Sequence, residues 1–250
     1  MNIDLSNKTA LITGASQGIG EAAARKLAIC GANVVLCARS QAKIQRISEE
    51  IGEHAVAVQC DVTHYAEVEN AVNVARNHFG SLDILVNNAG TIEPISRLED
   101  SIPEEWKAVV DVNLMGVYHG LRAAYWAMKL NGGVIINISS GAASSALEGW
   151  SHYCATKAAV LSLTRCAHKE WNEHGVHVVG LSPGTVATDM QSAIKDSGVN
   201  PVSKLDWSKH ISPEWAGEAI AWLASDAGRK HDGGDFSLKT EEGLREVGLI

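Results

Sequence analysis

The sequence predicts an α/β fold in which a doubly wound parallel sheet of about seven strands carries helices on both faces. Short apolar runs rich in β-branched residues recur along the chain, and longer segments with apolar spacing near 3.6 residues alternate with them. Repeated alternation of strand and helix gives right-handed crossovers and therefore parallel strands. The uniformly apolar character of the runs fits a sheet that is buried on both sides.

The expected strands leave room for a helix between one strand and the next. In chain order they are Thr9–Thr13, Val34–Leu36, Ala55–Val58, Ile84–Val86, Val134–Ile138, Val176–Gly180 and Asp235–Leu238. The helical patterns include Ile19–Ile29, Val68–Phe79, Trp106–Met128 and Ala155–Trp171. Residues 185–212 follow no period, and a long irregular connection in a compact domain is typical of a lid. No repeat or linker divides the chain, so a single domain over residues 1–250 is expected.

Composition narrows the class of partner. The 250 residues are 46% apolar and carry a formal net charge of −8 without a basic run, which favours a small-molecule ligand over nucleic acid or an anionic membrane. No apolar stretch is long enough to span a membrane, and Met1–Lys8 lacks the pattern of a signal peptide. Five cysteines show no metal-ligand spacing and are interpreted as reduced thiols, so a cytoplasmic protein without a metal site is expected.

A glycine-rich turn follows the first expected strand and opens the first expected helix. It reads TGASQGIG from Thr13 to Gly20. Gly14 permits a tight turn, Gly18 lets the backbone approach a diphosphate, and the N–H groups at the helix start favour an anion. The turn predicts a Rossmann-type dinucleotide site, with a tight connection that binds nothing as the alternative. The residues expected to contact the cofactor here are Gly14, Ser16, Gln17, Gly18, Ile19 and Gly20.

The end of the second strand predicts which dinucleotide binds. An Asp or Glu about twenty residues past the turn would accept hydrogen bonds from a ribose 2′-hydroxyl, but the chain has Arg39 and Ser40 there. The Arg39 guanidinium offers a fork of donors that suits a 2′-phosphate, and Ser40 adds a hydroxyl. NADP(H) is therefore expected over NAD(H), and a solvent-facing arginine at the start of a loop is the alternative.

Tyr153 and Lys157 stand one helical turn apart, which places a phenol and an ammonium on the same helix face. A neighbouring cation lowers the pKa of a phenol from about 10 because it favours the phenolate. The pair therefore predicts acid–base chemistry on an alcohol or carbonyl oxygen. A lysine stem that merely covers an aromatic ring is the alternative.

The order of these motifs resembles the short-chain dehydrogenase/reductase family, in its compact single-domain branch of about 250 residues. The matching stretches run from Lys8 to about Leu238: TGASQGIG at Thr13–Gly20, Asp61-Val62, NNAG at Asn87–Gly90, Asn113, Ser140, YCATK at Tyr153–Lys157, and Pro183-Gly184 with Thr188. The interval of thirteen residues from Ser140 to Tyr153 makes the match more specific.

The resemblance implies an active site of Asn113, Ser140, Tyr153 and Lys157. Tyr153 would exchange a proton with the substrate oxygen, and Ser140 would hydrogen-bond the same oxygen. Lys157 would lower the pKa of the phenol and bind the nicotinamide ribose, while Asn113 would anchor a water that leads from Lys157 toward solvent. Ser139 is the alternative to Ser140, but the interval to Tyr153 favours Ser140.

The resemblance also implies cofactor contacts past the carboxyl ends of the later strands. These are Asp61 and Val62 at the adenine, Asn87, Ala89 and Gly90 at the ribose and phosphate, and Pro183, Gly184, Val186 and Thr188 at the nicotinamide. Asn88 is expected to be structural instead. Gln17 stands where many NADP-using relatives carry a basic residue, so the NADP preference depends almost entirely on Arg39.

The expected function is that of an NADP(H)-dependent oxidoreductase that moves hydride between nicotinamide and a ketone, aldehyde or secondary alcohol. A 3-oxoacyl thioester reductase and a polyol or steroid dehydrogenase are alternatives of the same class, and a catalytically silent nucleotide-binding sensor is an alternative of another class. Thr91–Pro94, Gly141–Trp150 and the lid are the candidate substrate loops.

Trp150 is the candidate wall of the substrate pocket, beside Ser140 and Tyr153, with core packing as the alternative. His152 is expected to be structural. The long apolar helices predict a homodimer or homotetramer, and the tail Lys239–Ile250 has no assigned role.

Overall fold

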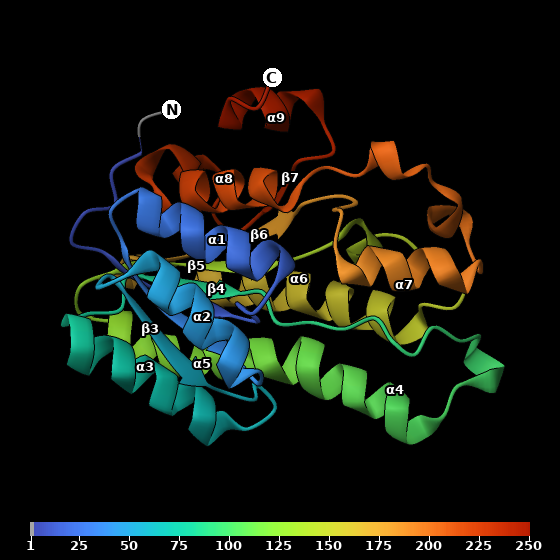
Figure 1. Ribbon diagram of the computed structural model, residues 1–250, viewed down its shortest axis with the longest axis horizontal. Coiled ribbons are helices and arrows are strands. Elements are labelled where there is room, and N and C mark those ends of the chain that lie inside the picture. Colours follow the sequence, from blue (N-terminus) through green and yellow to red (C-terminus); the bar gives the residue numbers. More distant parts are fainter. Residues whose placement is uncertain (1–2) are drawn as a thin grey trace.

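The computed structural model of the protein describes residues 3–250 and contains one parallel sheet of seven strands between two layers of helices (Figure 1). The strands are β1 (Thr9–Thr13), β2 (Asn33–Ala38), β3 (Ala55–Gln59), β4 (Ile84–Asn87), β5 (Gly133–Ile138), β6 (Val176–Ser182) and β7 (Asp235–Ser237). This confirms the expected fold class. Met1 and Asn2, the start of the segment in which no signal peptide is expected, lie outside the described residues.

The order of the strands in the sheet determines where a ligand can bind. The order is β3-β2-β1-β4-β5-β6-β7, so the chain winds in one direction from β1 to β3 and in the other from β4 to β7. The point of reversal lies between β1 and β4, where Ala10 pairs with Ile84. Connections leave the carboxyl ends of these two strands in opposite directions, which opens a crevice at that edge of the sheet.

The helices pack on the two faces of the sheet. They are α1 (Gly18–Ile29), α2 (Gln41–Ile51), α3 (Tyr65–Phe79), α4 (Pro103–Val110), α5 (Gly116–Met128), α6 (Ser151–Trp171), α7 (Asp189–Ser197), α8 (Pro213–Ala224) and α9 (Glu241–Val247). Buried side chains of α1, α2 and α8 cover one face, and those of α3, α5 and α6 cover the other. No helix within residues 3–250 is both long and apolar enough to cross a membrane.

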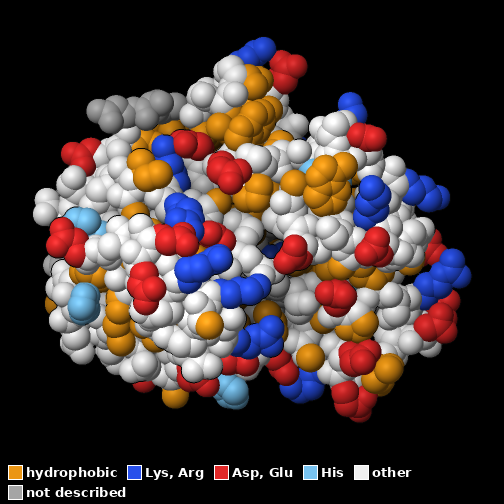
Figure 2. Space-filling model, viewed as in Figure 1, with side chains coloured by type: hydrophobic (Ala, Val, Ile, Leu, Met, Phe, Trp, Pro, Cys, Tyr) orange, Lys and Arg blue, Asp and Glu red, His pale blue; other side chains and the backbone are white. Residues whose placement is uncertain are grey.

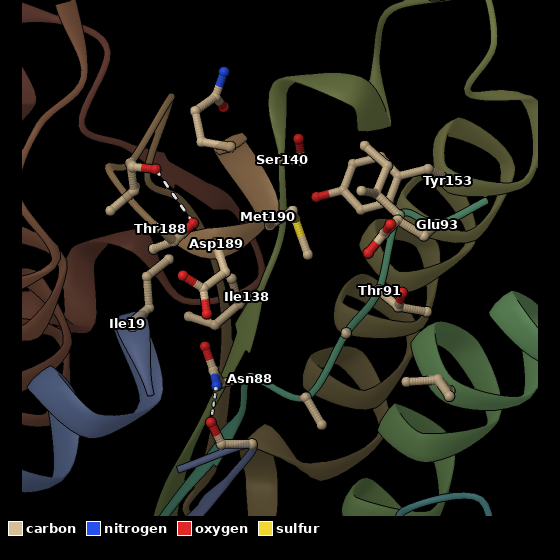
Figure 3. A pocket seen from close by; sticks show the side chains of 18 of the residues that line it. Ile19, Asn88, Thr91, Glu93, Ile138, Ser140, Tyr153, Thr188, Asp189 and Met190 are labelled. Carbon is tan, nitrogen blue, oxygen red and sulfur yellow. Dashed lines mark hydrogen bonds between the residues drawn. The ribbon is translucent and has the colours of Figure 1, made fainter. Parts of the chain in front are cut away.

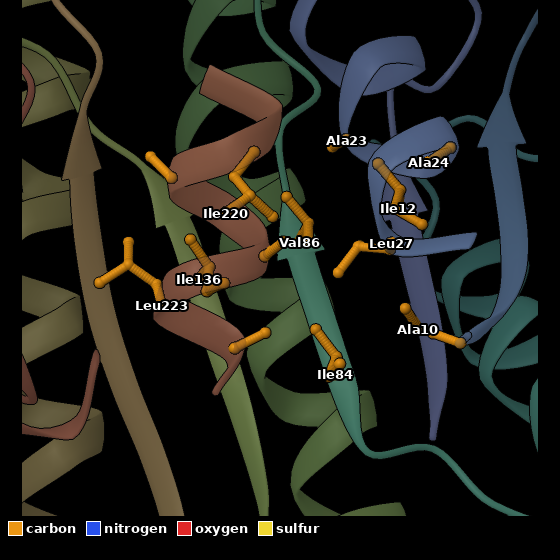
Figure 4. Close-up of a cluster of buried hydrophobic side chains, with 14 of the residues drawn as sticks. Ala10, Ile12, Ala23, Ala24, Leu27, Ile84, Val86, Ile136, Ile220 and Leu223 are labelled. Atoms are coloured by element: carbon orange, nitrogen blue, oxygen red, sulfur yellow. The ribbon is translucent and has the colours of Figure 1, made fainter. Parts of the chain in front are cut away.

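Alternation along the strands fills two apolar cores. In Figure 4, Ile12, Val86 and Ile136 project from neighbouring strands toward Leu27 of α1 and Ile220 of α8. The intervening strand residues point to the opposite face and meet α3, α5 and α6. Because each strand is apolar on both sides, the sheet cannot face water on either face.

The expected helix Trp106–Met128 is helical throughout, but a π-helical turn at Asp111–Met115 joins α4 to α5 within it. A π turn inserts one extra residue, which rotates the side chains that follow and is often found at functional sites. Asn113 lies inside this turn and is fully buried.

The segment 185–212 is more ordered than its sequence predicts. It contains α7 and two short 3₁₀ turns, at Pro201–Lys204 and Trp207–Lys209. Only Gln191 and Ile194 of α7 are buried, and two positions are too few to produce a readable period. A bridge between Val186 and Ile211 joins the two ends of the segment.

Candidate active site

A cavity of about 1260 Å³ lies at the carboxyl ends of the strands, at the expected crevice. Its lining comes from the segments that follow β1 through β6, together with α7. Figure 2 shows that this face of the molecule is hollowed near its middle, with basic and acidic side chains around the hollow. The cavity is large enough for a dinucleotide and a second small molecule side by side.

The glycine turn between β1 and α1 forms one wall of the cavity. Gly14 and Gly18 have φ values of +64° and +58°, a region in which side chains are strained. A Cβ at Gly14 would lie 2.9 Å from the Cα of Ala89, and one at Gly18 would lie 3.1 Å from the Thr188 methyl group. The backbone is therefore bare where a diphosphate would approach, so the turn fits the implied cofactor.

Gly20 has a different task from the rest of the turn. It does not line the cavity, whereas Gly14, Ser16, Gln17, Gly18 and Ile19 do. A Cβ at Gly20 would come 2.3 Å from the Gly14 carbonyl oxygen and 2.5 Å from Nδ2 of Asn88. Asn88 donates hydrogen bonds to the carbonyl oxygens of Thr13 and Gly14, so it stabilises the conformation of the glycine turn.

The ribose end of the cavity is basic. Arg39 and Ser40 are exposed and line it, and Lys43 in the first turn of α2 lines it as well. Lys43 Nζ donates a hydrogen bond to Gln17 Oε1 at 2.8 Å, which ties this helix to the glycine turn. The sequence reasoning missed Lys43, although its position four residues after Arg39 was a usable signal.

Asp61 and Val62 line the cavity beyond β3, as implied for an adenine site. Burial alone would raise the pKa of Asp61. Hydrogen bonds from the backbone and hydroxyl of Thr63, together with the charge of Arg39, outweigh burial and lower that pKa. The carboxylate is thus ionised and faces Thr63 at the rim of the cavity.

Asn87 does not occupy the position implied for it. Its side chain is buried away from the cavity and donates to Oδ1 of Asn137 at 2.8 Å. A Cβ at Gly120 of α5 would touch its Oδ1, so the amide fills the space between β4 and α5. The side chain of Asn87 therefore lies behind the cavity wall, and its contact with the cofactor stays a prediction. Ala89 and Gly90, which follow it, do line the cavity.

Asn113 supports the strand end next to the catalytic candidates. Its Oδ1 accepts from the Thr91 N–H and its Nδ2 donates to the Thr91 carbonyl, both at 2.8 Å. It does not line the cavity. A Cβ at Gly90 would lie 3.3 Å from Asn113 Oδ1 and 4.0 Å from Lys157 Nζ. The missing side chain of Gly90 thus leaves a small space between Asn113 and Lys157, where a water would fit the implied role.

Ser140, Tyr153 and Lys157 meet on the cavity wall. The Tyr153 hydroxyl points toward Ser140 in Figure 3. Lys157 Nζ donates to the Ile138 carbonyl oxygen at 2.7 Å and lies 5.5 Å from the centroid of the Tyr153 ring. Ser139, the alternative to Ser140, instead donates to Asp235 at 3.2 Å. The geometry therefore favours Ser140 as the serine next to the phenol.

The electrostatics of the pair differ from the expectation. Burial raises the pKa of Tyr153 to about 12, and the Ser140 hydroxyl opposes that rise. Burial also lowers the pKa of Lys157 to about 8, against the charge of Asp235. The ammonium of Lys157 lies 5.5 Å from the centroid of the ring, and burial outweighs any lowering of the Tyr153 pKa. The phenol therefore retains its proton at neutral pH, the form that donates to a carbonyl oxygen.

The side of the cavity beyond Tyr153 is mainly apolar. Trp150 is buried, lines the cavity and packs edge-to-face on Tyr153 with ring centroids 5.7 Å apart. It thus packs in a local core with Ile92 and Ile194 while it faces the site. Figure 3 places Glu93, which the sequence reasoning did not single out, on the same side as Tyr153.

His152 is structural, as expected. Its Nε2 lies 2.6 Å from the Pro94 carbonyl oxygen, and its Nδ1 accepts from the backbone N–H of Tyr153 at 2.6 Å. The Nε2 contact holds the loop after β4 against α6, and the Nδ1 contact lies within the first turn of α6.

The implied nicotinamide residues form the remaining wall. Pro183, Gly184, Val186 and Thr188 all line the cavity, where the chain passes from β6 into the segment 185–212. Ser140, Tyr153 and Lys157 also line it. Of the implied site residues, only Gly20, Asn87 and Asn113 stand behind the wall.

The model of the short chain dehydrogenase family matches residues 8–198. The chain belongs to the short-chain dehydrogenase family. Its relatives in this family include a Staphylococcus epidermidis protein named as an uncharacterized oxidoreductase, 37% identical over 187 residues that cover 74% of this chain and 81% of the relative. A Staphylococcus aureus protein with the same description is 36% identical over 220 residues, which cover 87% and 91% of the two chains.

Solved structures of short-chain dehydrogenases share the fold. A 3-ketoacyl-(acyl-carrier-protein) reductase from Brucella melitensis, complexed with NADH, superposes with a TM-score of 0.86 at 34% identity and covers 94% of this chain and 98% of its own. A short-chain type dehydrogenase/reductase from Mycobacterium marinum gives a TM-score of 0.86 at 33% identity, with 94% of each chain covered. The protein is therefore an oxidoreductase of this family, and the family uses a nicotinamide cofactor.

Proposed function

We propose that this short-chain dehydrogenase transfers hydride between NADP(H) and a ketone, aldehyde or secondary alcohol, with Tyr153 as the general acid and base. The observation that carries the proposal is the placement of Ser140, Tyr153 and Lys157 together on one wall of a cavity whose other wall is the bare glycine turn. NADP(H), when bound, supplies or accepts hydride at its nicotinamide ring.

Each side chain has a separate task in carbonyl reduction. The Tyr153 hydroxyl donates its proton to the carbonyl oxygen, and the Ser140 hydroxyl holds the same oxygen. Lys157 holds the ribose hydroxyls and supplies positive charge as the phenolate forms. Tyr153 is buried and packs against Trp150, which limits the access of water to the phenol. In the oxidative direction Tyr153 takes the proton back from the alcohol.

The NADP(H) preference is supported by the basic ribose end of the cavity. Arg39 and Lys43 supply two cations there, Ser40 adds a hydroxyl, and β2 ends without a carboxylate that could accept from a 2′-hydroxyl. The Brucella melitensis reductase is complexed with NADH, and that choice of cofactor is a property of that protein. The carboxylate of Asp61, which also lines the cavity, already accepts hydrogen bonds from the backbone and hydroxyl of Thr63.

Kinetic constants for NADPH and NADH test the preference. We expect Arg39→Asp to raise the KM for NADPH and to reduce the preference for NADPH over NADH by about tenfold or more, the effect of losing one charge-assisted contact of roughly 1.5–3 kcal/mol. Arg46→Ala is the matched control, because Arg46 is exposed on α2, just after Arg39, and pairs with Glu50 away from the cavity. An Arg39→Asp enzyme with an unchanged preference would contradict the assignment.

Two substrate classes have specific support. The Brucella melitensis relative is named a 3-ketoacyl-(acyl-carrier-protein) reductase, which favours a 3-oxoacyl thioester as the substrate here. The apolar wall of Trp150 and Ile194 also suits aromatic or aliphatic ketones, and polyol and steroid alcohols remain alternatives. NADPH consumption against 3-oxoacyl thioesters, diketones, ketoses and aromatic ketones separates these classes. Absence of turnover with the whole panel, combined with tight NADPH binding, would favour the nucleotide-binding sensor.

The segment 185–212 is proposed as the substrate lid. Met190, Gln191 and Ile194 of α7 line the cavity, and the bridge from Val186 to Ile211 gives the segment a fixed base. A segment whose two ends are held together while its helix is largely exposed has the arrangement of a lid that can move about a hinge. The apolar core on one face of the sheet includes residues from Leu5 to Val247, which supports a single domain.

Dimerisation is proposed through α5 and α6. Tyr118 and Trp126 of α5 are exposed, Trp126 to 64%, and border an apolar hollow with Trp171. Aromatic surface of this kind is typical of subunit interfaces. Sedimentation should show a dimer or tetramer at micromolar concentration, and a monomer alone would refute dimerisation.

The five free cysteines support a reducing, cytoplasmic setting.

A further inference from the structure

Asp235 begins β7 and faces α6, on the side of the sheet where the strand ends are polar. Its Oδ2 accepts hydrogen bonds from Ser182 Oγ at 2.8 Å and from Ser139 Oγ at 3.2 Å. The next residue, Phe236, points to the opposite face and joins the apolar core there. The carboxylate at the start of β7 thus contacts the carboxyl ends of β5 and β6.

Space for this carboxylate is provided by a glycine. Gly180 pairs with Asp235 between β6 and β7, and a Cβ at Gly180 would lie 2.7 Å from Asp235 Oδ1. That oxygen is buried and accepts no hydrogen bond from residues 3–250. An ionised carboxylate with one unbonded oxygen is costly to bury unless a cation lies near it.

The cations that act on Asp235 are both on α6. Burial raises the pKa of Asp235, and Ser182, Ser139 and then the charges of Arg165 and Lys157 oppose that rise. Conversely, Asp235 is the charged group that opposes the burial of Lys157. β5 and β6 contribute only the two serines to this contact.

The link between Asp235 and Lys157 also runs through the backbone. Ser139, which donates to Asp235, directly follows Ile138, whose carbonyl oxygen accepts the 2.7 Å hydrogen bond from Lys157. The same strand end therefore holds the carboxylate on one side and the ammonium on the other. Asp235 itself does not line the cavity, whereas Lys157 does.

We propose that Asp235 is a positioning residue for Lys157: its carboxylate, anchored by Ser139 and Ser182, keeps the Lys157 side chain charged and directed at the Ile138 carbonyl. This inference rests on the proposed function, in which charged Lys157 serves Tyr153 and the ribose. Asp235 touches neither substrate nor cofactor and acts only through Lys157.

The test is the pH dependence of carbonyl reduction in Asp235→Asn. This variant keeps the shape and an oxygen that accepts from both serines, but it removes the charge. Asp235 favours the charged form of Lys157, so its loss lowers the pH at which Lys157 gives up its proton. We expect the alkaline limb of kcat/KM to move to lower pH by about one unit. NADPH affinity, measured by fluorescence, should weaken over the same shifted range.

Two further variants make the result specific. Asp232→Asn removes a partly buried carboxylate of the same segment that pairs with His177 at 2.7 Å, and its profile should match the unmodified enzyme. Ser182→Ala removes the shorter of the two hydrogen bonds that anchor the Asp235 carboxylate. It should move the limb to lower pH, in the same direction as Asp235→Asn but by less, and it serves as the test if Asp235→Asn does not fold.

A profile of folded Asp235→Asn that superimposes on that of the unmodified enzyme would overturn the proposal, as would an equal shift in Asp232→Asn. So would an unshifted limb in Ser182→Ala. These failures are distinct from failure of the proposed function, which would show as retained turnover in Tyr153→Phe.

Discussion

Replacing Gly20 by alanine tests how the glycine turn is held. Gly20 lies in α1 with an ordinary helical backbone, so alanine alone would stabilise the helix by about 1 kcal/mol. Against this gain, the new Cβ would lie 2.3 Å from the Gly14 carbonyl oxygen and 2.5 Å from Asn88 Nδ2. Neither neighbour can retreat easily, because Asn88 is hydrogen-bonded to the carbonyl oxygens of both Thr13 and Gly14.

The collision should outweigh the gain in helix propensity. Overpacking against fixed atoms costs about 1–3 kcal/mol, and contact with backbone places this case at the upper end. We therefore expect a net loss of about 2 kcal/mol in the free energy of unfolding. Because Gly14 must move, NADPH affinity should also fall by about tenfold, equivalent to roughly 1.4 kcal/mol.

Urea unfolding and fluorescence titration with NADPH measure the two effects. Ala28→Gly, on the same helix, is the control: it should cost about 1 kcal/mol through helix propensity and leave the affinity for NADPH unchanged. A Gly20→Ala protein that is as stable as the unmodified protein and binds NADPH equally well would refute this reasoning about the turn.

Three more outcomes are expected. Tyr153→Phe should lose at least about 10²-fold in kcat, which is the contribution of a general acid, and it should still bind NADPH. Tyr125→Phe on α5 is the control and should keep full activity. Comparable turnover in the two variants would exclude Tyr153 as the proton donor. Carbonyl reduction should fall as the pH rises through about 8, because Lys157 loses its charge over that range while the pKa of Tyr153 is about 12. A kcat/KM profile flat to pH of about 10 would contradict this. Leu27→Ala removes a fully buried side chain and should lower the free energy of unfolding in urea by about 2–5 kcal/mol. Ile29→Ala, where the side chain is 79% exposed, should lower it by almost nothing. Equal losses in the two variants would argue against the packing of α1.

The elements predicted best are those whose signal is local. The expected strand Thr9–Thr13 matches β1 at both ends, and the helix Ile19–Ile29 differs from α1 by one residue. The glycine turn between them was readable because a positive φ at Gly14 and Gly18 is a property of single residues. Each of these features depends on a few neighbouring residues and not on distant partners.

The surroundings of Asn87, Asn88 and Asn113 depend on which way a strand or helix faces. Asn87 and Asn88 are adjacent and chemically identical, yet one is buried under Gly120 and the other supports the glycine turn. Side chains alternate along a strand, so a single position decides the assignment. Asn113 depends likewise on the π turn, whose extra residue is not marked by periodicity.

The sequence by itself determined the fold class and was enough to select the glycine turn, Ser140, Tyr153 and Lys157 as candidates, because apolar periodicity and short motifs depend on residues close together in the chain. Only the tertiary structure decided how those groups are tuned. Burial keeps the proton on Tyr153, and Asp235, 78 residues after Lys157, supplies the charge that opposes its burial. Burial and long-range charge are properties of the packed chain, and no local pattern carries them.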